Sequence, residues 1–182
     1  MATTDFYRGA AAAALFLLGA GTLYAARRTG CGIDRSTVPG FDLHRMMGLW
    51  YEIARFDHRF ERGLSHVTAV YTLERDGTVR VRNQGLKGDE LTYHASRATA
   101  RMPDSRHPGH LRVSFFPLFW SDYNVLEVDD DYSCMLIGSR SDRYLWILCR
   151  QPVMPVGSLR KLLTRALGRG YDIRRLVWVD QG

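Results

Sequence analysis

The sequence lacks the patterns that mark most enzymes and metal sites. It has no glycine-rich phosphate loop, no Ser-His-Asp arrangement and no paired carboxylates. Its histidines show no metal-ligand spacing and fall mostly in predicted loops or at strand ends, which predicts surface positions: His44, His58, His66, His94, His107 and His110. These absences favour a protein that is not an enzyme and that uses no cofactor or metal.

The sequence also has no run of like charges. Its net charge of +6 and pI near 9.5 favour anionic partners such as lipid headgroups, nucleic acid or acidic ligands. The stretch RFDHRFERG at 55–63 interleaves arginines with phenylalanines, as nucleic-acid surfaces do. However, arginines alternate with inward-facing residues on several predicted strands, as at Arg80, Arg82 and Arg97, so they spread around the exterior. This distribution argues against nucleic acid.

The N-terminal segment addresses the protein to a membrane. An uncharged apolar run extends from Gly9 to Ala26. It is slightly longer than the usual h-region of a signal peptide, about 7–15 residues, and it is at the lower edge of the length of a spanning helix, about 17–25 residues. We expect residues 1–30 to be a signal or membrane anchor and 31–182 the folded domain. Small residues precede Cys31, a lipidation candidate, although Arg28 stands where lipoprotein signals carry an aliphatic residue. An uncleaved anchor is the alternative. Either predicts a cell-envelope location, at the outer membrane or the periplasmic face of the inner membrane.

From Gly48 onward the chain alternates apolar and polar residues with period two, which is typical of half-buried strands. Asp76-Gly77 marks a hairpin turn. Further strands are predicted at 91–101, 110–116, 122–128, 133–139 and 144–150, separated by turn-forming segments that include 117–121. Eight short strands in about a hundred residues indicate a sandwich or an up-and-down barrel.

The period changes after Pro155. Leucines at helical spacing predict an amphipathic helix over 158–167, with Ser158 as its N-cap and Gly168 or Gly170 at its end. A closed eight-stranded antiparallel barrel leaves an interior wide enough for one small ligand. The helix must therefore pack its apolar stripe on the outside, and the predicted fold is an all-β barrel with one C-terminal helix.

Several motifs resemble those of one family. Gly48-Leu49-Trp50 is similar to the Gly-x-Trp motif that opens the first strand of lipocalins, and YEIARF, SFF at 114–116 and YLWILCRQP at 144–152 resemble the bacterial outer-membrane and apolipoprotein D-like branch. The likeness runs from about Val38 to Val179. Asp129 matches the second family motif and Arg150 the third. The resemblance implies structural roles for Gly48, Trp50, Asp129 and Arg150, with Arg150 lying across Trp50 at the closed end.

With Trp50 and Arg150 facing inward, counting by twos predicts the side chains that line the barrel. Glu52 and Glu127 fall inward near the closed end, where they need partners or raised pKa values. Small and aromatic side chains together leave room for an acyl chain; a core merely filled by aromatics is the alternative. The predicted ligand-binding residues are Ala54, Phe56, Ala69, Tyr71, Val81, Ala98, Ala100, Val113, Phe115, Tyr123, Val125 and Trp146.

The family resemblance implies a lipid-binding protein that carries or stores a fatty acid or lysophospholipid. We expect its anionic headgroup at the rim near Arg59 and Arg62, a membrane surface as a further partner, and a monomer or weak homodimer. The alternative is a lipocalin-fold enzyme that acts on lipids through a cysteine thiol. Cys149 should point outward toward the helix, with Cys134 about opposite, either as a disulfide or as two free thiols.

Overall fold

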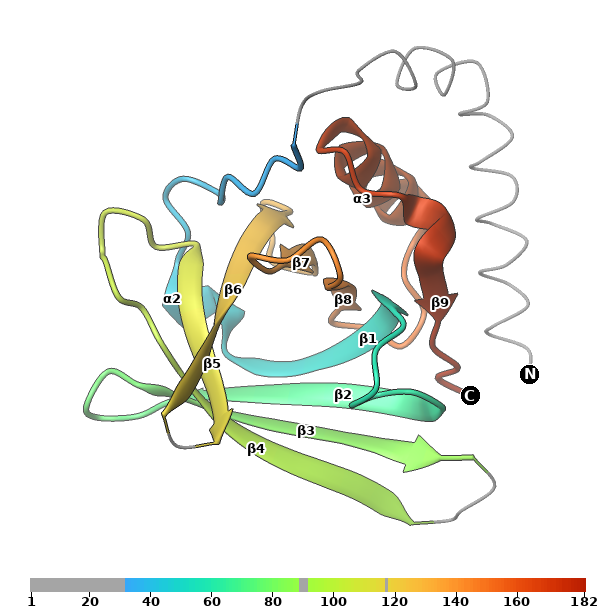
Figure 1. Ribbon diagram of the computed structural model, residues 1–182, viewed down its shortest axis with the longest axis horizontal. Coiled ribbons are helices and arrows are strands. Elements are labelled where there is room, and N and C mark those ends of the chain that lie inside the picture. Colours follow the sequence, from blue (N-terminus) through green and yellow to red (C-terminus); the bar gives the residue numbers. More distant parts are fainter. Residues whose placement is uncertain (1–31, 89–91, 117) are drawn as a thin grey trace.

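The computed structural model describes residues 32–88, 92–116 and 118–182. Within these ranges nine strands form one antiparallel sheet in the order β2-β3-β4-β5-β6-β7-β8-β1-β9, and pairing of β1 with β2 closes the first eight into a barrel (Figure 1). The strands are β1 Gly48–Phe56, β2 Leu64–Leu73, β3 Val79–Lys87, β4 Tyr93–Arg101, β5 His110–Phe116, β6 Phe119–Val128, β7 Cys134–Gly138, β8 Leu145–Cys149 and β9 Leu176–Trp178. The predicted barrel is confirmed.

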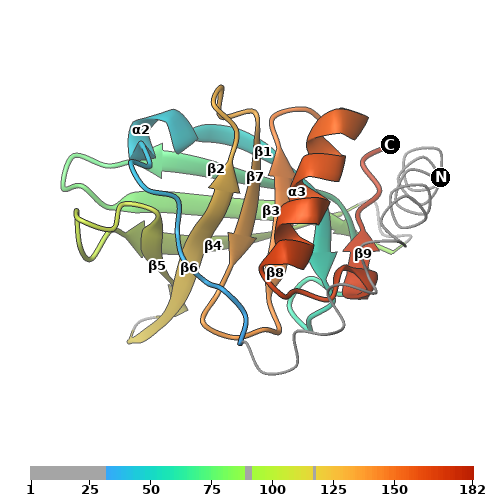
Figure 2. The same cartoon turned by 90° about the horizontal axis from the view of Figure 1, so that it is seen from above.

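Helices cover one end and one side of this barrel. The short α2, Leu43–Met46, precedes β1, and α3, Val156–Gly168, lies outside the wall beside β7 and β8 (Figure 2). A 3-10 turn, Ile173–Arg175, then leads into β9, which pairs with the far end of β1. No helix among the described residues is long and apolar enough to span a bilayer.

The predicted N-cap of α3 is wrong. The helix begins at Val156, two residues before Ser158, and Pro155 occupies the cap position without a side-chain hydrogen bond. Proline has its φ fixed near the helical value, so it is tolerated where no N–H is needed. At the other end Gly170 has φ +94°, and Tyr171 N donates to Ala166 O, which terminates the helix as the glycine pattern predicted.

Two apolar clusters lie on either side of the barrel wall. The outer cluster joins the buried face of α3 to β1, β7 and β8, and it includes Leu159, Leu163 and Ile147. The inner cluster fills the barrel from Trp50 and Met46 outward. Strands β1, β7 and β8 are therefore buried on both faces, because each separates the two clusters.

Bulges in two strands overturn three predicted orientations. The pairing of β1 with β8 shifts between Glu52 and Ala54, so Ala54 and Phe56 pack in the outer cluster rather than facing the cavity as predicted. A second shift in β6, between Val125 and Glu127, turns Glu127 outward, where its Oε1 lies 3.0 Å from Arg169 Nη2. A bulge adds one residue and thereby reverses the inward and outward phase beyond it.

Strand β6 also begins earlier than the sequence indicated. Residues 117–121 were predicted as a turn, but Phe119 already pairs with Phe116. Aromatic residues favour the extended backbone, so β5 and β6 continue as a hairpin almost to their tip.

The antiparallel order defines two ends of the barrel. The closed end carries α2 and the connections 74–78, 102–109 and 129–133. The open end carries the connections 57–63 and 139–144, together with Gly88 and Thr92 between β3 and β4 and Leu118 between β5 and β6. Strand β1 runs from Gly48 at the closed end to Phe56 at the open end.

Candidate functional site

Arg150 seals the closed end. Its guanidinium carbon lies 3.9 Å from the centroid of the Trp50 ring, which confirms the predicted contact. Its Nη1 and Nη2 donate to the carbonyls of Leu49, Arg45 and Met47, each at 2.8 Å. Trp50 Nε1 donates to Met46 O at 2.7 Å. These bonds tie β8 to β1 and α2, so both residues act structurally here.

Gly48 is required where β1 begins. Its φ is +98°, a conformation that favours glycine, and a Cβ there would lie 3.3 Å from Arg150 Nη1. Asp129 orders the neighbouring turn: its carboxylate accepts from Ser133 N, Ser133 Oγ and Cys134 N at 2.6–2.8 Å. Gly48 therefore allows Arg150 to approach the backbone closely, and Asp129 holds the turn before β7; both geometries are structural.

A cavity of about 90 Å³ opens inside the barrel above this plug. Its wall is mostly apolar and includes Ala69, Ala100, Leu111 and Val113. Sites for drug-sized ligands usually measure about 300–1,000 Å³. The cavity as it stands therefore fits part of an acyl chain rather than a whole lipid.

Most of the predicted lining residues do face the interior. Seven of them line the cavity: Ala69, Tyr71, Val81, Ala100, Val113, Tyr123 and Trp146. Phe115 also lines it while remaining 46% exposed at the mouth. Ala98 and Val125 belong to the inner cluster but do not border the cavity. Ala54 and Phe56 lie outside, and the inward phase predicted for them is wrong.

A buried polar cluster borders the same cavity through Glu52, Glu61 and Trp146. The inward position predicted for Glu52 is confirmed, whereas the sequence did not indicate its partners Arg55, His58 and Glu61. Because the β1 bulge turns Arg55 inward, its Nη1 donates to Glu52 Oε1 at 2.6 Å. From the first open-end connection, Glu61 reaches in and accepts from Trp146 Nε1 at 3.1 Å. His58 Nε2 lies 2.8 Å from Glu61 Oε2. The segment 57–63 therefore folds partly into the barrel mouth.

His58 is enclosed, so its predicted surface position is wrong. Its side chain is 9% exposed, and its ring lies 5.4–6.1 Å from the rings of Phe60, Tyr144 and Trp146. Tyr144 and Trp146 stack with an interplanar angle of 11°. No periodicity marks the orientation of a loop residue, so His58 and Glu61 gave no signal in the sequence.

The two cavity carboxylates have opposite pKa shifts. Burial, followed by the nearby Glu61 carboxylate, raises the pKa of Glu52 to about 8. Burial would raise the pKa of Glu61 too, but the hydrogen bond and charge of His58, with Trp146 and Arg55, hold it below its usual value. We conclude that Glu52 is the carboxyl that takes up a proton near neutral pH.

A tyrosine pair crosses the cavity. The hydroxyls of Tyr71 and Tyr123 lie 2.8 Å apart, and burial is the main cause that raises the pKa of each phenol. Both therefore stay neutral, and they satisfy each other's hydrogen bonds inside an otherwise apolar wall.

The two rim arginines already have neighbours. Arg62 Nε donates to Asp57 Oδ2 at 2.9 Å, and the Arg59 guanidinium carbon lies 4.7 Å from the Phe60 ring centroid. Arg62 and Asp57 are both substantially exposed, so their pairing is weak and open to competition by an anion.

Two cysteines lie in the part of the chain that the structure describes, and both are free and buried. Cys134 and Cys149 pair across β7 and β8, their sulfurs are 3.4 Å apart, and both belong to the outer cluster beneath α3. Neither lines the cavity. The outward orientation predicted for Cys149 is confirmed, and Cys134 lies opposite it on the same side of the wall. Cys31 lies outside the described residues.

A second hollow of about 260 Å³ lies outside the barrel against α3, lined by charged residues such as Glu127, Asp129, Lys161 and Arg165. It is a polar surface groove and does not connect with the predicted lining residues. Across the described residues, no group of three or more His, Cys, Asp or Glu side chains could hold a metal ion.

Known proteins are similar to this chain in sequence, and solved structures are similar to it in fold. The Lipocalin-like domain family matches residues 41–181. The chain is 40% identical over 146 residues to the outer membrane lipoprotein Blc of Escherichia coli K12, covering 80% of this chain and 82% of that protein. It is 30% identical over 148 residues to apolipoprotein D of Mus musculus, covering 78% and 77%.

The fold recurs in more distant proteins. Insecticyanin from the tobacco hornworm Manduca sexta superposes with a TM-score of 0.68 at 18% identity, covering 83% of this chain and 86% of insecticyanin. At that identity the likeness concerns the fold alone.

Proposed function

The chain belongs to the lipocalin family, and from that premise we propose that it binds a fatty acid or lysophospholipid and carries or stores it without transforming it. The observation that carries this proposal is the apolar cavity inside the barrel, whose wall combines alanines with aromatic and branched side chains. Alanines on β2 and β4, at Ala69 and Ala100, leave space that bulky aliphatic residues would fill.

The lipid would enter tail first. Burying an acyl chain contributes about 0.8 kcal/mol per methylene, whereas the Glu61 carboxylate in the wall disfavours an anion deep in the barrel. The headgroup would therefore remain at the mouth, with its anion near Arg59 and Arg62. Because segment 57–63 narrows the mouth, we propose that a full-length tail displaces it outward.

We also propose that residues 1–30 address or anchor the domain 31–182 to the cell envelope, with Cys31 as a lipidation site or the apolar run from Gly9 to Ala26 as an uncleaved anchor. The relatives named outer membrane lipoprotein support this location. The expected assembly is a monomer or weak homodimer.

Native mass spectrometry of the full chain, combined with extraction of co-purified lipid, tests the binding proposal. We expect one lipid per chain and stoichiometric displacement of a fluorescent fatty acid. If no lipid is recovered and no fluorescent fatty acid binds, the proposal is wrong.

A further inference from the structure

We propose that the open end of the barrel docks directly on the membrane surface, with the β5–β6 hairpin tip inserted among the lipids. This inference rests on the proposed function, because it assumes that the N-terminal segment is held in a membrane. It adds an orientation and an interaction surface that anchoring alone does not supply.

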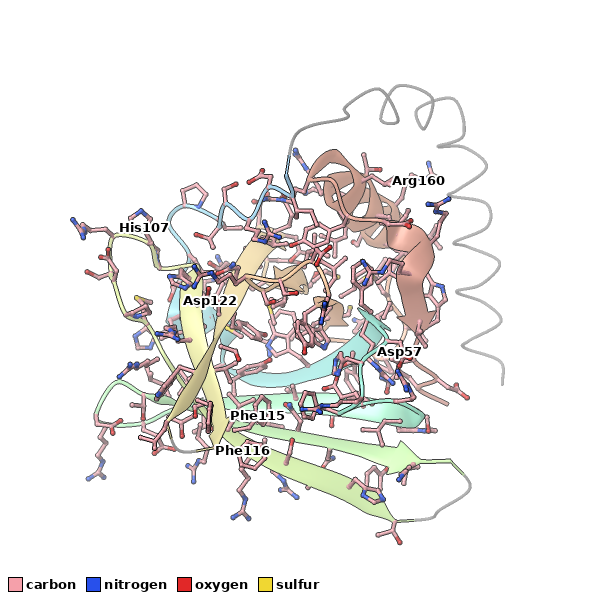
Figure 3. The ribbon with its side chains drawn as sticks, in the orientation of Figure 1. Asp57, His107, Phe115, Phe116, Asp122 and Arg160 are labelled. Atoms are coloured by element: carbon pink, nitrogen blue, oxygen red, sulfur yellow. The ribbon has the colours of Figure 1, made fainter. Side chains whose placement is uncertain are left out.

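The open rim exposes large apolar side chains. At the hairpin tip Phe116 is 67% exposed, Leu118 91% and Phe119 76%. Phe60 in the first connection and Tyr93 at the start of β4 are 63% and 55% exposed. Figure 3 shows Phe115 and Phe116 at one end of β5, opposite the end near His107. Single exposed apolar residues are ordinary, but a cluster at one tip marks an interaction site.

The hairpin tip also holds its leucine in an unfavourable conformation. Leu118 has φ +78°, in the left-handed region that favours glycine or asparagine. The strained backbone of Leu118 is not offset by packing, because its side chain is almost fully exposed. Such positions are typical of functional surfaces.

The closed end has the opposite character. Its connections carry acidic side chains: Glu74, Asp76, Asp104, Asp129, Asp130 and Asp131. These acidic side chains outnumber the basic Arg75 and Arg106 of the same connections, so anionic lipid repels this end of the barrel. If the domain approaches a bilayer, the rim with exposed aromatics is the favoured face, because aromatic rings are stable at the membrane interface.

The described part of the chain begins near the open end, beside the C-terminus of α3 (Figure 2). Asp34 N donates to Arg169 O, which lies just beyond the C-terminus of α3. From Arg169 the chain continues through η1 to β9, where Leu176 pairs with Phe56 at the open end of β1. In the other segment, residues 35–42 run from Asp34 past β6 to α2 at the closed end, and Val38 N donates to Val125 O (Figure 2).

The length of the tether decides the orientation. Only residues 27–31 separate the apolar run, which ends at Ala26, from Gly32, and such a link reaches at most about 20 Å. The barrel itself is roughly 25 Å long once strand tilt is allowed for. The closed end therefore lies beyond easy reach of the bilayer, whereas the open end lies against it. A lipid tail could then pass from the bilayer into the cavity without crossing water.

Photocrosslinking of the full chain in phosphatidylethanolamine–phosphatidylglycerol vesicles tests the docking. p-Benzoylphenylalanine replaces Leu118 at the hairpin tip or, as the matched control, Asp76 at the closed end. We expect at least tenfold more lipid adduct from position 118. Adducts to a second chain would instead assign this surface to self-association and overturn the proposal, as would equal lipid adduct at both positions or none at either.

Transfer kinetics separate docking from ligand binding. Leu118→Gly with Phe119→Ser removes apolar surface, and glycine suits the backbone of the tip. We expect lipid uptake from vesicles to slow at least tenfold, with affinity for a water-soluble fluorescent fatty acid unchanged. The control variant carries Val153→Ser and Val156→Ser, two exposed positions before and at the start of α3. It should take up lipid at the original rate. Normal uptake by the hairpin variant overturns docking, whereas loss of fatty-acid binding in the unaltered protein overturns the proposed function.

Discussion

Ala100→Leu should block the cavity that we propose as the ligand site. Ala100 lies on β4, is 3% exposed and borders the cavity. Leucine adds three carbon groups to a space of about 90 Å³, and each excludes about one methylene of the ligand. At about 0.8 kcal/mol per methylene the loss is about 2.4 kcal/mol, which corresponds to roughly 50-fold weaker binding.

The matched control is Thr99→Leu, which adds an apolar side chain to the neighbouring exposed position on the same strand. Titration with a fluorescent fatty acid measures both affinities, and urea unfolding verifies that both variants fold. We expect the control to bind within twofold of the original protein. Equal affinity of Ala100→Leu and Thr99→Leu would refute the assignment of this cavity as the acyl site.

Three further predictions concern stability. Arg150→Leu should lower the free energy of unfolding, measured by urea titration, by about 3 kcal/mol, because the ring contact and the charged hydrogen bonds are lost. The control Arg143→Leu, at an exposed position, should lower the same free energy by less than about 0.5 kcal/mol. Because the pKa of Glu52 is raised from 4.5 to about 8, the folded state binds its proton more tightly, so stability should fall as pH rises across that window. Unfolding of Glu52→Gln at pH 5 and pH 8 should show a smaller difference, and an unchanged difference would contradict the assignment. Oxidation of Cys134 and Cys149 to a disulfide should stabilise the domain by up to about 3 kcal/mol; a loss of 2 Da by mass spectrometry with no rise in the urea midpoint would contradict this.

The sequence predicts the barrel because most of its strands have one buried face and one face exposed to solvent. In β3 the alternation of Val79 and Val81 with exposed Arg80 and Arg82 reports the phase directly. The contact between Arg150 and Trp50 was predictable for another reason, since both residues stand in motifs that resemble those of a known family.

Prediction from the sequence fails where a strand is buried on both faces, because polar and apolar residues then no longer alternate. From Glu52 to Phe56 every residue of β1 is buried, because α3 and β9 cover one face and the cavity wall forms the other. A bulge in such a strand leaves no trace in the polar pattern, so Arg55 was missed and Ala54 and Phe56 were placed on the wrong side. The inward folding of His58 and Glu61 depends on contacts between distant segments, such as Trp146 with Glu61, which no local pattern encodes.

The most direct test of the central claim is to locate the lipid tail. A lysophospholipid with a diazirine at the end of its acyl chain, irradiated with the full-length protein, labels the residues that the tail contacts. The account predicts one label per chain, on cavity residues such as Tyr71, Leu111 and Tyr123, and its loss in Ala100→Leu. Labels confined to the exposed rim or to the groove beside α3, or no labelling, would contradict it.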